Sequence, residues 1–207
     1  MKYSCANAWL VIASAVVITA APARAEIHAA LGKLVSGKGN DQLDAAVVIT
    51  SNRDEVIQSL LQIAETSNVK TGSAYLAKQL AIDCLGDYRA ERAVDFLISE
   101  IEFNEAIPRK RAVADPDPKS GLPCLRSLIQ IGRPAIDGIF KRLVRPSTTR
   151  ELALFGFIIH EIDGQEVGLY RLQVALGKAD GIQKEQIQRT IEIYRNEGWA
   201  KREYLSD

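Results

Sequence analysis

Residues 122–144 read LPCLRSLIQIGRPAIDGIFKRLV, and this stretch decides how the rest of the chain is interpreted. Each half has apolar residues at helical spacing. They are Leu125, Leu128 and Ile129 in the first half, and Ile136, Ile139, Phe140, Leu143 and Val144 in the second. Between the halves, Gly132 can take the left-handed conformation that ends a helix, and Pro134 suits the first turn of the next. The stretch predicts two antiparallel helices joined by a tight turn.

The same pattern recurs along the chain. A single hairpin leaves an apolar stripe uncovered on each helix, so it must stack on others like it. Residues 93–101 repeat the spacing of residues 135–143 at an offset of 42, and looser copies begin at Val56 and Gly168. Helix pairs repeating every 33 to 42 residues or so are typical of α-solenoids. We therefore expect an all-α fold, a solenoid of about four antiparallel helix pairs within residues 26–207, with no strand.

Capping signals mark where several of these helices begin. Asn52 with Glu55, and Thr148 with Glu151, have the spacing of a capping box. Ser73 can cap a third helix through its hydroxyl group. These residues predict helix starts near positions 53, 74 and 149.

Turn signals mark where the helices end. Gly86-Asp87 should close a helix that runs to about Leu85, and residues 163–166 should separate two further helices. The expected buried positions around the first turn are Leu76, Leu80 and Ala81 before it, and Val94, Leu97, Ile98 and Ile101 after it. Residues 180–194 predict a terminal helix with one polar side, which is what the end of a stack requires.

Composition supports a packed core but points to no charged partner. Hydrophobic residues make up 47% of the chain, whereas aromatic residues make up 6%, so aliphatic side chains must fill the core. The chain has 26 basic and 26 acidic residues, and this balance removes the electrostatic argument for nucleic-acid binding. We therefore expect no nucleic-acid partner.

The N-terminal 25 residues resemble an export signal. Lys2 precedes an apolar run over residues 8–21, and small residues at Ala23 and Ala25 suit signal peptidase. We predict a signal peptide over residues 1–25, and hence a periplasmic or secreted protein. The run of about 14 residues is shorter than the roughly 20 that span a bilayer, so no stable membrane span is expected after cleavage. A retained N-terminal anchor is the alternative.

Export makes Cys84 and Cys124 worth testing as a disulfide. Aligning the two hairpins places Cys84 opposite Gln130, six residues from Cys124, or about 9 Å along a helix axis. Adjacent helices are a further 8–10 Å or so apart. A disulfide needs Cα atoms within about 7 Å. We therefore predict two buried thiols.

The hairpin residues resemble HEAT repeats, in particular the short bacterial HEAT-like type also seen in phycobilisome-lyase-related proteins. The resemblance is carried by residues 81–87 (AIDCLGD) followed by 93–97 (AVDFL), and by residues 128–132 (LIQIG) followed by 134–137 (PAID). The resemblance is good over about residues 73–144 and loose over residues 40–66 and 147–177. The resemblance implies a right-handed superhelix that serves as a protein-binding surface. Because the motif is a packing motif, it carries no catalytic residues over to this chain.

Residues 107–121 (IPRKRAVADPDPKSG) interrupt the helical pattern. Three prolines exclude a continuous helix, so we expect an exposed loop. Arg109, Lys110 and Arg111 in this loop are the candidate partner-binding residues, since they can hold an acidic protein, a phosphate or a lipid headgroup. They also fit a solvated loop or a protease site. Arg142, Arg145 and Arg150 extend the basic patch if the solenoid brings the turns to one edge.

No motif in the chain predicts catalysis, a metal or a cofactor. His160-Glu161-x-Asp163 has no second histidine at the zinc-protease spacing. Residues 115–126 begin like a calcium loop but lack its later ligands. We therefore expect a non-catalytic module that binds an unidentified protein, without catalytic residues, metal or cofactor. The alternatives are a lyase-like or cofactor-attaching enzyme, suggested by the repeat's relatives, and a HEAT-type DNA-binding protein, which the charge balance disfavours.

Overall fold

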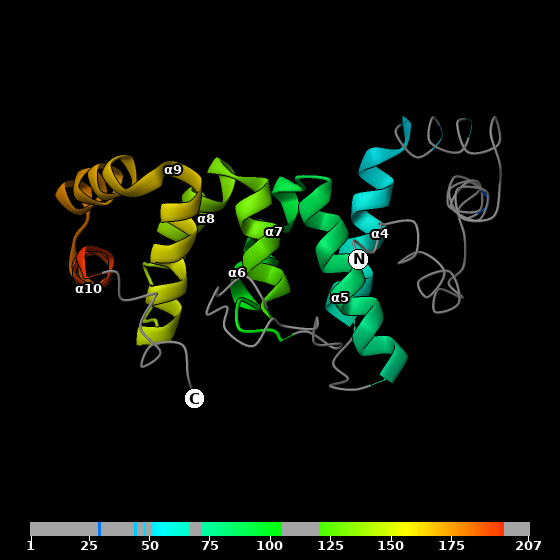
Figure 1. Cartoon of the computed structure of the whole chain (residues 1–207), viewed down its shortest axis with the longest axis horizontal. Coiled ribbons are helices and arrows are strands. Elements are labelled where there is room, and N and C mark those ends of the chain that lie inside the picture. The colour runs from blue at the N-terminus through cyan, green and yellow to red at the C-terminus, as the bar shows by residue number, and fades with distance from the viewer. Residues whose placement is uncertain are drawn as a thin grey trace, which may run out of the picture. The chain divides into compact units, whose positions relative to one another are not determined.

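The structure, a computed structural model, describes residues 51–66, 72–104 and 121–196, together with Ala29, Asp44 and Val48 (Figure 1). The regular elements of these residues are α-helices and one 3-10 helix, with no strand, which confirms the all-α expectation. The chain forms two compact units, residues 1–88 and 89–207. The expected signal peptide lies outside the described residues.

The first unit contains the helix pair α4 (Arg53–Thr66) and α5 (Gly72–Asp87), which pack against each other. The buried apolar side chains of α4 are Val56, Ile57, Leu60, Leu61 and Ala64, and those of α5 are Ala77, Ala81, Ile82, Cys84 and Leu85. Both sets recur at helical spacing, as one contact face requires. In the repeat copy that begins at Val56, the predicted positions Val56, Leu60 and Ala64 are buried, whereas Ile63 is only half-buried. On α5, Ala81 is buried, whereas Leu76 and Leu80 are only half-buried.

The ends of α5 differ from the sequence expectation. The helix begins at Gly72, so Ser73 lies inside its first turn and is not the capping residue. It continues through Gly86 and Asp87, and the turn follows at Arg89, whose φ is 47°. Gly86 is buried within the last turn of the helix. The prediction of a Gly86-Asp87 turn was therefore wrong by about two residues.

The start of α4 is tied to the residues before it. The Asn52 side-chain amide donates a hydrogen bond to the Val48 carbonyl oxygen at 2.7 Å, and the Asn52 backbone N–H donates to the same oxygen at 3.1 Å. The side-chain amide nitrogen of Asn52 is therefore directed toward Val48, four residues earlier in the sequence. The guanidinium group of Arg53 donates to the Tyr88 carbonyl oxygen at 2.6 Å, which links the start of α4 to the end of α5.

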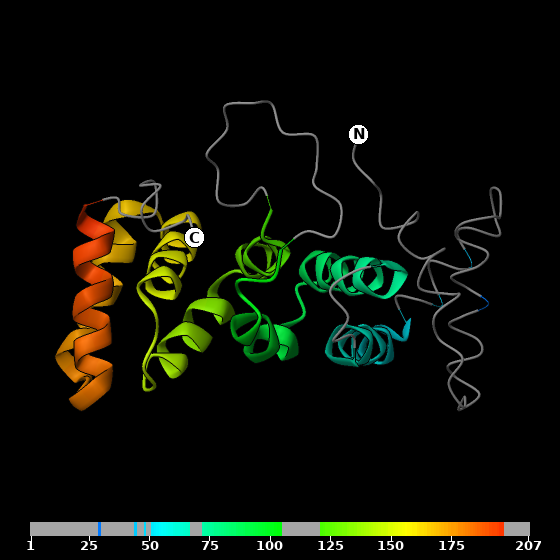
Figure 2. The same ribbon diagram turned by 90° about the horizontal axis from the view of Figure 1, so that it is seen from below.

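Within its described residues, 89–104 and 121–196, the second unit contains one 3-10 helix, η1 (Glu91–Ala93), and five α-helices. The α-helices are α6 (Val94–Ser99), α7 (Pro123–Ile131), α8 (Arg133–Arg142), α9 (Thr149–Lys178) and α10 (Gly181–Arg195). Helix α6 packs against α7 and α8, both of these pack against α9, and α9 packs against α10 (Figure 2). The core of this unit is therefore built from helices close in sequence.

The pair α7 and α8 forms the hairpin predicted from residues 122–144. Its turn is Gly132, with φ of 85° and ψ of −138°, so φ is positive as expected while ψ lies outside the left-handed helical range. Leu128, Ile136 and Ile139 are fully buried, as predicted. Val144 is 51% exposed, so placing it in the buried stripe was wrong. Leu143, the C-cap residue of α8, is still fully buried as predicted, so the buried stripe ends one residue before Val144.

Helices α6 and α8 approach each other closely at Gly138. A Cβ atom built on Gly138 would lie 2.3 Å from Cγ1 of Val94 and 2.9 Å from Cδ1 of Ile98. Both of these side chains belong to the predicted stripe on α6, and both are buried. A glycine at this position lets two short helices share one contact face.

The first part of α9 is the central helix of the second unit. Its eight residues 152–159 (LALFGFII) are all buried, which is typical of a helix covered on every side. The predicted capping box is confirmed at its start, since Glu151 N–H donates to Thr148 Oγ1 at 3.0 Å and Thr148 N–H donates to Glu151 Oε2 at 2.8 Å.

The two cysteines of the described helices do not form a disulfide. Cys84 and Cys124 are both buried and both thiols, which confirms the sequence prediction. They act as small apolar side chains in the helix contacts. Among the described residues, none of the helices has the length and apolar character needed to cross a membrane.

Leu128→Ala tests the α7 contact face. Leu128 is fully buried, so its truncation removes apolar contacts and leaves a cavity, and we expect a loss of about 2–5 kcal/mol in the free energy of unfolding. Gln188→Ala on the exposed side of α10 is the control and should change stability by less than about 0.5 kcal/mol. Urea unfolding of both variants makes the comparison. Equal losses would contradict the assignment of Leu128 to the core.

Candidate functional site

Helix α9 is bent at Gly164, and the bend divides it into segments over residues 149–163 and 165–178. Gly164 has φ of 76° and ψ of 173°, a combination that essentially only glycine adopts. Figure 1 shows the two segments, in yellow and orange, meeting at an angle. The turn predicted over residues 163–166 is therefore confirmed as a sharp change of direction within α9.

Tyr194 of α10 holds this bend. Its side chain is fully buried, and its hydroxyl group donates to the Gly164 carbonyl oxygen at 2.9 Å, with the Gln165 carbonyl oxygen 3.2 Å away. The Tyr194 hydroxyl group therefore contacts two successive carbonyl oxygens at the point where the backbone of α9 departs from helical angles. A Cβ atom on Gly168 would lie 2.3 Å from the Tyr194 oxygen, so this second glycine makes room for the hydroxyl group.

Charged and polar side chains flank the bend on both segments. The Asp163 carboxylate, whose side chain is 3% exposed, accepts a hydrogen bond at 2.5 Å from Nε of Arg171. His160 Nδ1 lies 3.1 Å from Oε1 of Gln165, and the His160 ring meets the Tyr194 ring edge-on at a centroid distance of 6.2 Å. These pairs bridge the first segment, the second segment and α10.

The electrostatics of the bend keep Tyr194 protonated. Burial, followed by the negative charge of Asp163, raises the pKa of Tyr194 from 10.0 to about 12. The phenol therefore remains a hydrogen-bond donor throughout the neutral range and is poorly matched to proton transfer there. No three His, Cys, Asp or Glu side chains among the described residues are grouped so as to hold a metal ion. The cluster around Gly164 is suited to fixing the shape of α9.

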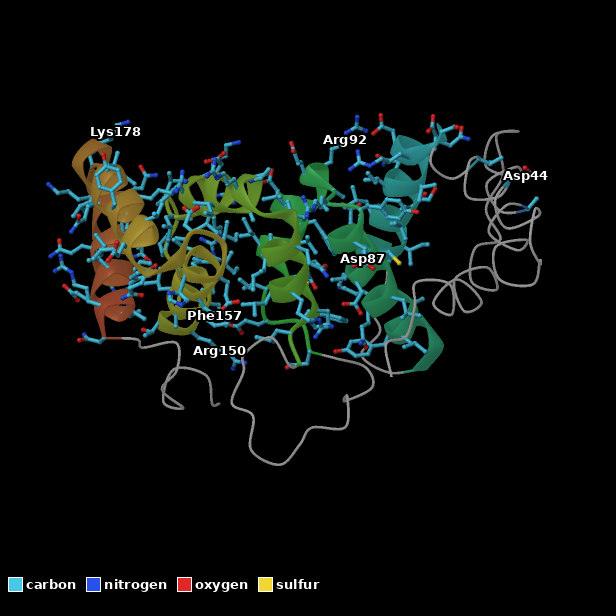
Figure 3. The ribbon with its side chains drawn as sticks, turned by 45° about the horizontal axis from the view of Figure 1, so that its top comes forward. Asp44, Asp87, Arg92, Arg150, Phe157 and Lys178 are labelled. Carbon is cyan, nitrogen blue, oxygen red and sulfur yellow. The ribbon has the colours of Figure 1, made fainter. Side chains whose placement is uncertain are left out.

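The outer face of the second segment of α9 carries large exposed apolar side chains. Val167, Tyr170 and Val174 are 51%, 67% and 40% exposed, and their spacing places them in one row on the helix. Gly168 and Leu172 on the opposite side are buried. We call Val167, Tyr170 and Val174 the α9 outer row. Figure 3 shows Lys178, which ends this segment, at the edge of the ribbon.

The arginines near the turn between α8 and α9 are engaged in local structure. Arg142 donates to the Pro146 carbonyl oxygen at 3.2 Å and to Oε1 of Glu151 at 3.1 Å, the same carboxylate that caps α9. Nε of Arg150 lies 3.9 Å from Oε1 of Glu102, and both arginine side chains are mostly buried. Arg145 is exposed. Two of the three residues expected to extend a basic patch therefore have partners within the fold.

The predicted partner-binding residues Arg109, Lys110 and Arg111 lie outside the described residues, as does most of the loop over residues 107–121. The structure instead draws attention to the α9 outer row, which sequence reasoning missed. The repeat copy that begins at Gly168 matches Leu169, Leu172 and Leu176, whereas the three residues of the outer row lie outside its pattern. Their spacing of three and four residues is the signal of a second stripe on the same helix.

Comparisons of the chain with protein-family models, with curated proteins and with solved structures gave no match. The resemblance to HEAT repeats therefore rests on the residues of the hairpins themselves.

Gly168→Ala tests the close contact that holds the bend. The new methyl group would overlap the Tyr194 oxygen and lie 3.0 Å from Cγ2 of Ile159, so we expect a loss of about 1–3 kcal/mol in unfolding free energy. The matched control is Gly177→Ala on the same segment, where a Cβ atom meets nothing within 4 Å. Its stability should stay the same or rise by up to about 1 kcal/mol, since alanine favours a helix.

The same substitution in a Tyr194→Phe background gives a sharper result. Removing the hydroxyl oxygen relieves the closest overlap, so Gly168→Ala should cost at least about 0.5 kcal/mol less than it does in the wild type. Urea unfolding of the four proteins measures this coupling. Additive costs would show that the contact between Gly168 and Tyr194 is not what limits the substitution.

The stability contribution of Tyr194 should depend on pH in the alkaline range. Because its pKa is raised to about 12, the folded protein binds the phenol proton more tightly than the unfolded chain does. This contribution is complete below about pH 10 and is lost as the pH rises toward about 12. We expect the difference in unfolding free energy between wild type and Tyr194→Phe to shrink across this window in urea titrations. A constant difference would contradict the assignment.

Proposed function

We propose that the protein is an exported, non-catalytic helical-repeat module of the HEAT-like type, and that it binds another polypeptide through the α9 outer row. The observation that carries the proposal is the exposure of Val167, Tyr170 and Val174 on one helix face. Single exposed apolar residues are ordinary in soluble proteins, whereas a contiguous row of them is typical of an interaction site.

The composition of the row suits binding. Tyr170 is its most exposed member, and tyrosine is enriched among the residues that dominate binding energy, since it offers a large rigid area and a polar tip. Val167 and Val174 flank it one turn away on either side. A partner helix or strand laid along the segment would remove all three side chains from water together.

The row also has rigid support. Gly168 and Leu172 on the opposite side of the segment are buried, and the Tyr194 hydroxyl group fixes the direction in which the segment leaves the bend. A surface that is already ordered loses little conformational freedom on binding, so more of the contact energy appears as affinity.

The repeat architecture and export are parts of the same proposal. Helix pairs such as α7 and α8, with Gly132 at the turn, support a stack of HEAT-like units. The apolar run and small residues within residues 1–25 support export. The loop over residues 107–121 is a second candidate contact through Arg109, Lys110 and Arg111. The described residues provide no observation that favours the lyase-like alternative.

Cross-linking in the native host tests the proposal. Tyr170→Glu places a charge in the middle of the row, so we expect loss of the cross-linked polypeptide without a change in melting temperature, because Tyr170 is mostly exposed. Gln188→Glu on the exposed side of α10 introduces the same charge elsewhere and should leave the cross-link intact. Equal recovery of the partner with all three proteins would remove the outer row from the mechanism.

The loop is tested separately with Arg109→Glu combined with Lys110→Glu. If the loop contributes, this double variant should recover less of the partner at an unchanged melting temperature. Unchanged recovery would show that binding does not use these residues and would leave the α9 outer row as the contact.

A further inference from the structure

We propose that Gly164 is a single-residue hinge, and that straightening it lets two copies of this chain exchange their C-terminal helices. The exchanged part, which we call the C-terminal module, is residues 165–196, the second segment of α9 together with α10. The module leaves the described residues 89–104 and 121–163, which we call the body. The exchange does not use the α9 outer row, so it does not depend on the proposed function.

One residue separates α9 from a continuous helix. Within Thr149–Lys178, Gly164 alone has backbone angles outside the helical range. A change of its two dihedral angles would therefore align the two segments along one axis. Glycine is not confined to negative φ, so it adopts the bent and the helical angles without the steric cost that other residues meet. Both shapes of α9 are therefore compatible with this sequence.

The module docks on the body through specific polar contacts. The side-chain amide of Gln183 donates to the Phe140 carbonyl oxygen at 2.9 Å, and the Ser147 backbone N–H donates to Oε1 of Gln186 at 3.2 Å. The Gln186 side chain is buried. If the module left the body, these groups would lose the partners that the closed chain provides.

Apolar contacts near the bend impose the same requirement. A Cβ atom on Gly168 would lie 3.0 Å from Cγ2 of Ile159, and the Tyr194 ring meets the His160 ring at a centroid distance of 6.2 Å. Ile159 and Tyr194 are fully buried. An open monomer would expose both side chains to water, and this disfavours opening without a replacement for the module.

A second copy of the chain is the partner that supplies this replacement. Its body offers the same carbonyl oxygen, backbone N–H and apolar side chains in the same places, so two open chains that exchange modules recover the contacts of the closed chain. The backbone of Gly164 is the part that differs. Exchange should be slow, because both chains must first open, and it should increase with protein concentration. The resulting dimer carries two α9 outer rows.

Gly164→Ala tests the hinge. A Cβ atom on Gly164 meets nothing within 4 Å, so the substitution acts through the backbone angles. Alanine is strained at the bent angles and favours a helix, so we expect the dissociation constant of the dimer to fall by at least about a hundredfold. Size-exclusion chromatography with light scattering, after refolding from urea, measures this change. The control is Gly177→Ala, at a helical position with equal space, which should behave like wild type.

Isotope-filtered NOE spectra of a dimer refolded from labelled and unlabelled chains identify the exchange. The Arg189 guanidinium group lies 3.1 Å from Oγ1 of Thr149 in the closed chain, and this contact should now join different chains. Finding it only within one chain would reveal surface association and overturn the proposal. Adding Tyr170→Glu to Gly164→Ala should leave the dimer intact. Dissociation would assign the dimer to the outer row and overturn the exchange.

Wild type provides the test if Gly164→Ala does not fold, which circular dichroism melting decides. Wild type refolded from urea at high concentration should yield a minor dimer that returns slowly to monomer after dilution. A wild type that yields no dimer under these conditions would overturn the proposal. A folded Gly164→Ala protein that stays monomeric would do the same.

Discussion

The hydrogen bond from Tyr194 to the Gly164 carbonyl oxygen is the interaction on which the second unit depends. It joins residues 30 positions apart and ties α10 to the bend in α9. Gly164 supplies backbone angles that other residues avoid, and Gly168 supplies the space for the hydroxyl group.

Glycines let helices of this unit approach each other closely. With few aromatic residues in the chain, helices gain contact area by close approach, as at Gly138 between α6 and α8. The central segment over residues 152–159 is covered on every side by its neighbours. Polar side chains of α10 complete the arrangement: Gln183 donates to the Phe140 carbonyl oxygen at 2.9 Å, and Gln186 accepts from the Ser147 backbone N–H at 3.2 Å.

The polar side chains beside the bend have structural roles. The charged pair Asp163 and Arg171, together with His160, serves the shape of α9, whereas Val167 and Tyr170 remain exposed to solvent. The titratable groups beside the bend therefore stabilise the fold. The exposed apolar row is the feature that internal packing leaves unexplained, and it lies on a segment whose direction is fixed by the bend.

The sequence by itself determined the features that depend on neighbours within one or two helical turns. These include the capping box of Thr148 and Glu151, the hairpin of α7 and α8, and the thiol state inferred for Cys84 and Cys124. Tertiary structure decided the turn at Arg89, the exposure of Val144 and the contact of Tyr194 with Gly164. The physical reason is the separation along the sequence between the residues that determine each feature. Periodicity and caps are local, whereas burial and side-chain hydrogen bonds depend on helices that the chain brings together from distant positions.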